Sequence, residues 1–183
     1  MKRVLLIASL VVAAASTAFA ASAVPGMQGA GNKPEVSYFG DWAVRCFPIK
    51  SASPCDMLFA TVRKNTAQRV TSVSIAYVPS KGTYLMQVAV PLGIDLGQGV
   101  VIQAGGYSTQ KLTVRRCDQS GCFVEMGVGN DLIEGLSQNS DQGGQLKVVA
   151  TGGKPVSLAM SLKGFSAAHQ AMVDGARQKA SAP

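Results

Sequence analysis

Short apolar runs, each ended by a turn-forming residue, follow one another from Val36 to about Leu162. This pattern limits the possible folds of the chain more than any other feature of the sequence. Such runs between Gly, Pro, Asn, Asp or Ser are typical of strands and leave little room for long helices. The pattern predicts an all-β domain, built as a sandwich or a closed barrel. The expected strands are residues 40–47, 56–64, 70–78, 84–90, 100–103, 111–117, 122–126, 145–150 and 156–162.

Two segments depart from this pattern and predict short helices. Asn130 and Asp131 precede spaced apolar residues, which indicates a capped helix of about two turns. Ser166 is expected to cap a second, C-terminal helix. We therefore expect a β-sandwich domain over residues 38–173, after a flexible leader at 21–37 and before a flexible tail at 174–183.

The first residues predict a secretory signal peptide at 1–20, or to Ala23 if the second site is cleaved. Lys2 and Arg3 precede an apolar stretch at 4–15, and small residues follow at the cleavage positions. That stretch is shorter than the roughly 20 residues that span a bilayer. We expect a periplasmic or secreted protein, with association with the outer membrane left open, and no transmembrane segment after the signal is removed.

Export predicts that the four cysteines form disulfides, because disulfides persist outside the cytoplasm. Three pairings are open to four cysteines. We expect Cys46 with Cys55 and Cys117 with Cys122, because each pair brackets a turn-rich stretch between two strand-like segments. Neither pair has the spacing of a zinc knuckle, so we expect no metal site.

The charge balance is modestly basic, with 17 Lys and Arg against 10 Asp and Glu. No run in the mature chain exceeds the pairs Arg63-Lys64 and Arg115-Arg116, whereas nucleic-acid binders concentrate their charge. We expect no nucleic-acid partner and a mild attraction to anionic surfaces. Lys163, Arg115 and Arg116 are the candidate interaction surface.

Little in the chain supports catalysis. His169 is the only histidine, and the nearby Ser166 lies in a segment that misses the nucleophile-elbow pattern. Carboxylates such as Asp118 and Glu125, near the second cysteine pair, could serve glycoside hydrolysis, but acidic residues are few and scattered. We expect no enzyme, no catalytic residue and no cofactor. Five aromatic residues are more simply read as core than as a ligand groove: Phe39, Trp42, Phe59, Phe123 and Phe165.

Four motifs in order resemble the invasion-associated locus B family: residues 39–46, 90–100, 117–122 and 161–168. The resemblance spans about Tyr38 to Met172. It implies an exported bacterial protein with an immunoglobulin-like antiparallel β-sandwich, and no known catalytic residues. Founding members are associated with the invasion of host cells, although many relatives come from bacteria that invade nothing. The family's four-cysteine arrangement agrees with the pairing expected from spacing.

These observations predict an exported, non-enzymatic envelope protein that acts by macromolecular interaction, with host-cell association as a further role. Its partner would be an unknown protein or envelope component. The first alternative is a periplasmic binding module for a small molecule, glycan or lipid, which requires a pocket of roughly 300 Å³ or more. A hydrolase is the second alternative, and it requires two carboxylates that converge in one cleft. Oligomeric state is left open.

Overall fold

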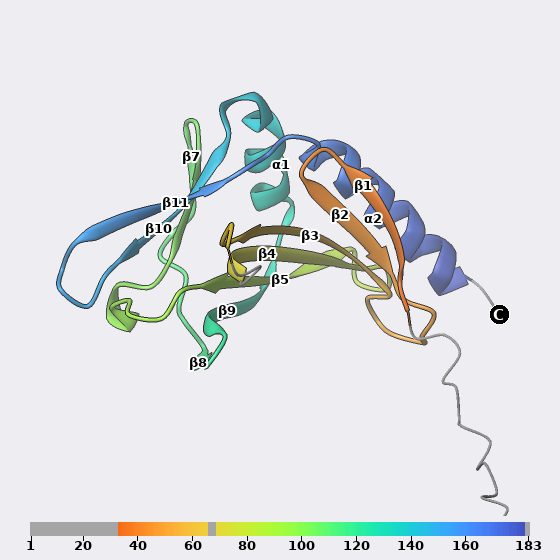
Figure 1. Ribbon diagram of the computed structural model, residues 1–183. Helices are drawn as coiled ribbons and strands as arrows, with labels where there is room; N and C mark the ends of the chain where they lie inside the picture. The colour runs from red at the N-terminus through yellow and green to blue at the C-terminus, as the bar shows by residue number, and fades with distance from the viewer. Residues whose placement is uncertain (1–32, 66–68, 182–183) are drawn as a thin grey trace, which may run out of the picture. The chain divides into compact units, whose positions relative to one another are not determined.

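Two antiparallel sheets form the protein, for which the computed structural model describes residues 33–65 and 69–181 (Figure 1). The larger sheet has the strand order β1-β2-β3-β4-β5-β9-β8. Its strands are β1 (Glu35–Phe39), β2 (Trp42–Cys46), β3 (Cys55–Val62), β4 (Arg69–Val78), β5 (Thr83–Val90), β8 (Arg116–Asp118) and β9 (Gly121–Val128). The smaller sheet has the order β11-β10-β6-β7, with β6 (Val101–Ala104), β7 (Tyr107–Ser108), β10 (Gly144–Val149) and β11 (Pro155–Met160).

Four helical segments complete the chain: α1 (Asn130–Gln138), α2 (Phe165–Ser181) and the short 3-10 turns η1 (Leu96–Gln98) and η2 (Ser140–Gln142). The prediction of an all-β sandwich with two helices, one of them C-terminal, is confirmed, and two separate sheets favour the sandwich over the closed barrel. Strand β1 and the two-residue β7 were not predicted. Only residues 116 and 117 of the strand expected at 111–117 belong to β8, while Leu112 makes an isolated bridge to Val100.

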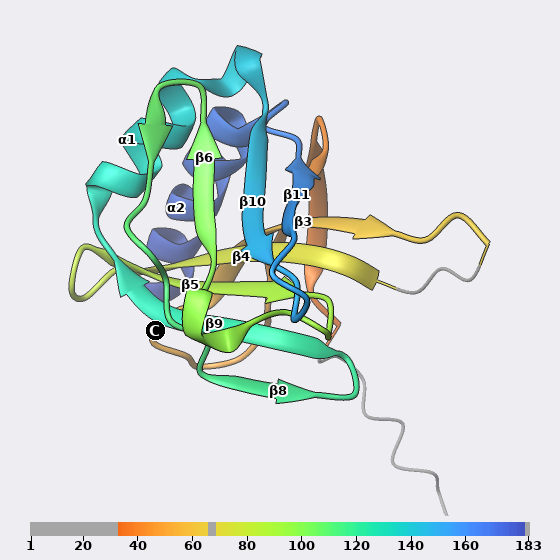
Figure 2. The ribbon, with the colours of Figure 1, turned by 90° about the vertical axis from the view of Figure 1, so that its left-hand side faces the viewer.

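Among the described residues, the larger sheet is covered on one face only. Helices α1 and α2 and the smaller sheet all lie on the same side of β3, β4, β5 and β9 (Figure 1). Figure 2 shows β6, β10 and β11 crossing the direction of the strands of the larger sheet, as in orthogonal sandwiches. The side chains of the covered face form the core, among them Val44, Met57, Phe59, Val73, Ile75, Tyr77, Tyr84, Val88 and Val124.

Strict alternation places the remaining side chains on the opposite, outer face. Strand β4 is buried at Val73, Ile75 and Tyr77, and the residues between them, Ser74 and Ala76, are only half-buried. The same alternation runs through β2, the first five residues of β3 and the first six of β5. The outer face therefore carries both polar and apolar side chains, such as Ser74 and Leu85, that are partly exposed to solvent.

Both predicted disulfides are present. Cys46 pairs with Cys55, and Cys117 pairs with Cys122. Each pair joins residues that lie directly opposite each other in an antiparallel register, with Cα atoms 4.1 Å and 4.0 Å apart. Each bond therefore closes one hairpin of the larger sheet.

Helix α2 is longer than expected, and the flexible tail predicted at 174–183 is wrong for its described part, because the helix continues to Ser181. Its buried residues recur at helical spacing as far as Ala176, which is fully buried. A Cβ at Gly175 would lie 2.8 Å from Sγ of Cys46 and 3.2 Å from Sγ of Cys55. The helix therefore packs on the first disulfide at Gly175, within the polar part of its sequence.

Two other boundaries also differ. The leader predicted at 21–37 is corrected, because β1 begins at Glu35 and pairs with β2 along its whole length. Ser166 does not cap α2, because the helix already begins at Phe165. Helix α1 starts at the expected Asn130, but neither it nor Gly129 before it supplies a side-chain cap. The predicted signal peptide lies outside the described residues.

The first and last of the four motifs meet at one junction between the β1–β2 turn and the start of α2. Nε1 of Trp42 donates a hydrogen bond to the carbonyl oxygen of Ser161 at 3.0 Å, and the backbone N–H of Asp41 donates to the carbonyl of Lys163 at 3.0 Å. Oγ of Ser161 lies 2.6 Å from Oδ2 of Asp41. Phe165 packs edge-on against Trp42. These motif residues hold the edge of the sheet to α2.

The five aromatic residues were predicted to pack in the core. Trp42, Phe59, Phe123 and Phe165 are buried, and Phe39 is half-buried against them. Phe123 differs from the others because its ring faces the outer side of the sheet, where arginine side chains cover it.

Candidate functional site

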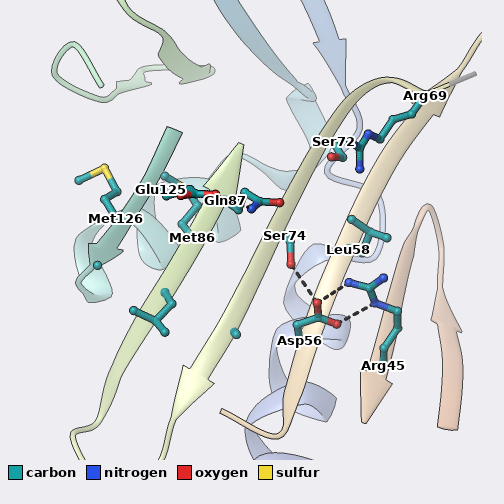
Figure 3. Close-up of a pocket in the computed structure, with 13 residues that line it drawn as sticks. Arg45, Asp56, Leu58, Arg69, Ser72, Ser74, Met86, Gln87, Glu125 and Met126 are labelled. Atoms are coloured by element: carbon teal, nitrogen blue, oxygen red, sulfur yellow. Dashed lines mark hydrogen bonds and ion pairs between the residues drawn. The ribbon is translucent and has the colours of Figure 1, made fainter. Parts of the chain in front are cut away.

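An open groove of about 560 Å³ crosses the outer face of the larger sheet (Figure 3). Strands β2, β3, β4, β5 and β9 form its floor. Since this face has no covering layer among the described residues, most of the side chains that line the groove are accessible from solvent, while Ser72 and Met86 are buried.

One wall of the groove is a partly buried ion pair between Arg45 and Asp56. Nε of Arg45 donates to Oδ1 of Asp56 at 2.9 Å, and its Nη2 contacts Oδ2, so the contact is bidentate. Oγ of Ser74 donates to the same Oδ2 at 3.0 Å (Figure 3). The hydrogen bond to Asp56 raises the pKa of Arg45. This wall holds both charges in fixed positions.

The opposite wall is a second network on β5, β8 and β9. Nε2 of Gln87 donates to Oε1 of Glu125 at 2.9 Å, and the same oxygen lies 3.2 Å from Nη2 of Arg116. Arg116 also pairs with Asp118 and stacks its guanidinium 4.0 Å from the ring centre of Phe123. Its position is therefore set by two carboxylates and one aromatic face.

Apolar side chains occupy the centre between the two walls. Leu58, Ala76 and Leu85 line the groove there, and Leu85 is 50% exposed although it is a large apolar residue in a central strand. An apolar centre with a rim of charged and polar groups is the usual anatomy of a protein interface. The groove has the composition of a binding surface.

The predicted interaction residues do not form one surface. Arg116 borders the groove through Glu125, and Arg115, its exposed neighbour on the chain, binds β9 through its backbone N–H. Lys163 lies beside the β1–β2 turn, whereas β8 forms the other edge of the seven-stranded sheet. The structure places Lys163 apart from the two arginines, and their role as an interaction surface stays a prediction.

Several groove residues were not singled out from sequence: Arg45, Asp56, Leu58, Arg69, Ser74, Leu85 and Gln87. Their signal is present in the alternation of β3, where Asp56 and Leu58 alternate with the buried Met57 and Phe59. The alternation marks an outward face, but only the strand order shows which outward residues become neighbours.

The groove gives little support to hydrolysis. Asp56 and Glu125 both line it, but they stand on β3 and β9, which are three inter-strand spacings, or roughly 14 Å, apart. Paired carboxylates in glycosidases lie about 5 to 10 Å apart. Each is also bound to an arginine. Asp118, the other carboxylate considered from sequence, shares Arg116 with Glu125, and hydrogen bonds from Ser120 lower the pKa of Asp118.

His169 lies on α2, away from the groove, and is half-buried. Its Nε2 is 2.9 Å from the hydroxyl of Tyr84, and burial lowers the pKa of His169. Within residues 33–65 and 69–181, no three His, Cys, Asp or Glu side chains converge as metal ligands would.

These features define a class: a two-sheet β-sandwich with two disulfide-closed hairpins, a C-terminal helix packed on one of them, and an open groove on its uncovered face. The sequence profile of the invasion associated locus B (IalB) protein matches residues 42–173. The chain belongs to this family. Its disulfides and its family together indicate an extracytoplasmic protein.

A solved structure has the same fold. The crystal structure of invasion associated protein B from Bartonella henselae is 23% identical, with a TM-score of 0.66, and the match covers 79% of this chain and 99% of that one. At this identity the likeness concerns the fold. None of the curated proteins matches the chain. No helix in the described part is long and apolar enough to cross a membrane.

Proposed function

We propose that this member of the family is an exported, non-enzymatic envelope protein that binds a protein partner through the groove on its outer sheet face. The proposal rests on the half-exposed side chain of Leu85, which lies between the two walls that contain ion pairs. In the described part of a monomer, half of this large apolar side chain stays in contact with water. Burial against a partner would add its apolar area to the binding energy.

Export is the first requirement of this proposal. The mature chain is proposed to begin at Ala21 or Val24 and to reside in the periplasm or outside the cell. The mass of the intact native protein measures this directly. A chain that retains Met1 to Ala20 would remove the basis for the proposed location.

The proposed role is tested by chemical crosslinking in living cells, followed by mass identification of the adducts. We expect a reproducible protein adduct with the wild type. The adduct should be lost in Leu85→Glu, which places a charge in the groove, and retained in the matched control Ala159→Glu, on an exposed position of β11. An adduct that both variants lose equally, or that both retain, contradicts binding through the groove.

A second candidate is a binding module for a small molecule or glycan. The size of the groove favours it, since about 560 Å³ exceeds the roughly 300 Å³ that small-ligand sites need. Fixed carboxylate, guanidinium and amide groups on its walls would supply the hydrogen bonds. Recovery of a small ligand alone from the crosslinked cells supports this candidate and contradicts the protein partner.

Host-cell association remains part of the proposal through the family alone. The family's name and that of the solved relative refer to invasion. Comparison of a deletion strain with its parent for association with host cells would test this role. An unchanged association contradicts it and leaves the groove as a site within the envelope.

A further inference from the structure

A small notch lies at one end of the seven-stranded sheet, beyond the groove. It has a volume of about 160 Å³ and is lined by Arg63, Arg69, Leu92 and Ser120, among others. Strand β3 ends and β4 begins here, and the β5 exit and the β8–β9 turn lie at the same end. The antiparallel order of the strands therefore brings two arginines into one concave site. This site lies at the end of β3 opposite to the Cys46–Cys55 disulfide.

The notch is cationic. In the part of the chain that the structure describes, neither Arg63 nor Arg69 forms an ion pair. Lys64 is exposed beside Arg63 and adds a third positive charge. The nearest acidic group along the notch, Asp118, is held by Arg116 and by the backbone and hydroxyl of Ser120. Arg63 and Arg69 both line this small space, although the guanidinium of Arg69 also lies over the ring of Phe123, and guanidinium groups bind tetrahedral oxyanions such as a phosphate group.

Exposed apolar side chains stand beside these charges. Val62 is 58% exposed and precedes Arg63, and Leu92 is 55% exposed on the rim of the notch. Val62 does not line the notch, so a free anion bound there would leave it exposed to water. Cations that flank exposed apolar side chains are the arrangement by which proteins bind the interface of an anionic membrane.

We propose that this end of the sheet binds the surface of an anionic bilayer, with the phosphate of a lipid headgroup in the notch between Arg63 and Arg69. Val62 and Leu92 then enter the boundary between headgroups and acyl chains. The site is distinct from the groove, although Arg69 borders both. It would let an exported protein without a spanning helix in its described part reside at a membrane surface.

The test is co-sedimentation of the mature, disulfide-bonded protein with lipid vesicles. One set contains phosphatidylcholine alone, and the other contains phosphatidylglycerol as well. We expect binding to the anionic vesicles only, and weaker binding as salt is raised. The variant Arg63→Gln/Arg69→Gln should bind roughly 25-fold more weakly, at about fivefold for each cation near the surface.

The matched control removes two charges elsewhere. Lys81 lies in the β4–β5 turn at the opposite end of the larger sheet, and Lys147 lies in the smaller sheet. Lys81→Gln/Lys147→Gln should bind nearly as the wild type does. Leu92→Ser should weaken binding and leave its dependence on salt unchanged. Thermal unfolding of each variant verifies that it is folded.

Three outcomes overturn the proposal. Equal losses in the two double variants would show attraction by net charge alone. Unchanged binding of Arg63→Gln/Arg69→Gln would place any contact elsewhere. If inorganic phosphate shifts the amide resonance of Ser120 and the protein does not bind anionic vesicles, the notch is a site for a free anion.

Discussion

Phe165 packs edge-on against Trp42, with ring centres 5.1 Å apart, and both side chains are fully buried. The contact joins the first residue of α2 to the first residue of β2. The burial of Phe165 was expected from sequence, whereas its position as the first residue of the helix was not. This pair is one of the contacts that attach α2 to the sheet, together with the fully buried Met172 and Ala176.

Removal of this ring should therefore be costly. We predict that Phe165→Ala lowers the free energy of unfolding by about 3 to 5 kcal/mol. Lys163→Ala, at an exposed neighbouring position, should change it by no more than about 0.5 kcal/mol. Urea unfolding measures both. Equal stability of the two variants would contradict the packing of Phe165.

The turn before α2 depends on Gly164. Its φ is +84°, and a Cβ there would overlap the carbonyl oxygen of Phe39. Gly153 has a φ of +80° but nothing within 4 Å of its Cβ position, so it is a matched control. Gly153→Ala should cost about 1 to 2 kcal/mol from backbone conformation. Gly164→Ala should cost about 1 to 3 kcal/mol more from overpacking, and similar losses would contradict the close approach to Phe39.

The two disulfides should differ in their effect on stability. Loop-closure entropy assigns each roughly 2 to 3 kcal/mol, with slightly more for the longer loop between Cys46 and Cys55. That bond also contacts α2 at Gly175, whereas Cys117 is exposed. We predict that Cys46→Ala/Cys55→Ala loses more unfolding free energy than Cys117→Ala/Cys122→Ala. The reverse order would show that the contact with α2 adds nothing.

Stability should fall on mild acidification because of His169. Burial lowers the pKa of His169 below the 6.5 of an unfolded histidine, with Asp174 opposing the shift. Below about pH 6.5 the unfolded chain therefore binds more protons at this site than the folded chain, and stability decreases as pH falls through the folded pKa. We expect this slope in urea unfolding between about pH 8 and pH 5, and its loss in His169→Gln. A slope that persists in the variant arises elsewhere.

The sequence predicted the elements that depend on residues close together in the chain. Strands β4 and β5 alternate clearly, and each disulfide closes a single hairpin. Strand β1 was missed because Glu35–Phe39 lies at the sheet edge with exposed side chains and has no alternating burial. The end of α2 was missed because Gly175 and its polar neighbours conceal the buried Ala176.

The groove depends on relationships that are not local. Arg116 was identified because it lies in a basic pair, but its partner Glu125 is fixed by the pairing of β8 with β9. Arg45 and Asp56 face each other only because β2 and β3 pair in one register. Sequence shows that such residues point outward, and the register decides which of them meet.

Site-specific photocrosslinking in living cells shows whether the outer face of the seven-stranded sheet is the binding surface. A photoreactive amino acid would replace Leu85 in the groove, and in a parallel strain Ala159 on β11 of the smaller sheet. We expect a discrete protein adduct from position 85 and none from position 159, because binding occurs in the groove. An adduct from position 159 alone, or none from position 85 while the mature protein is present in the envelope, would contradict it.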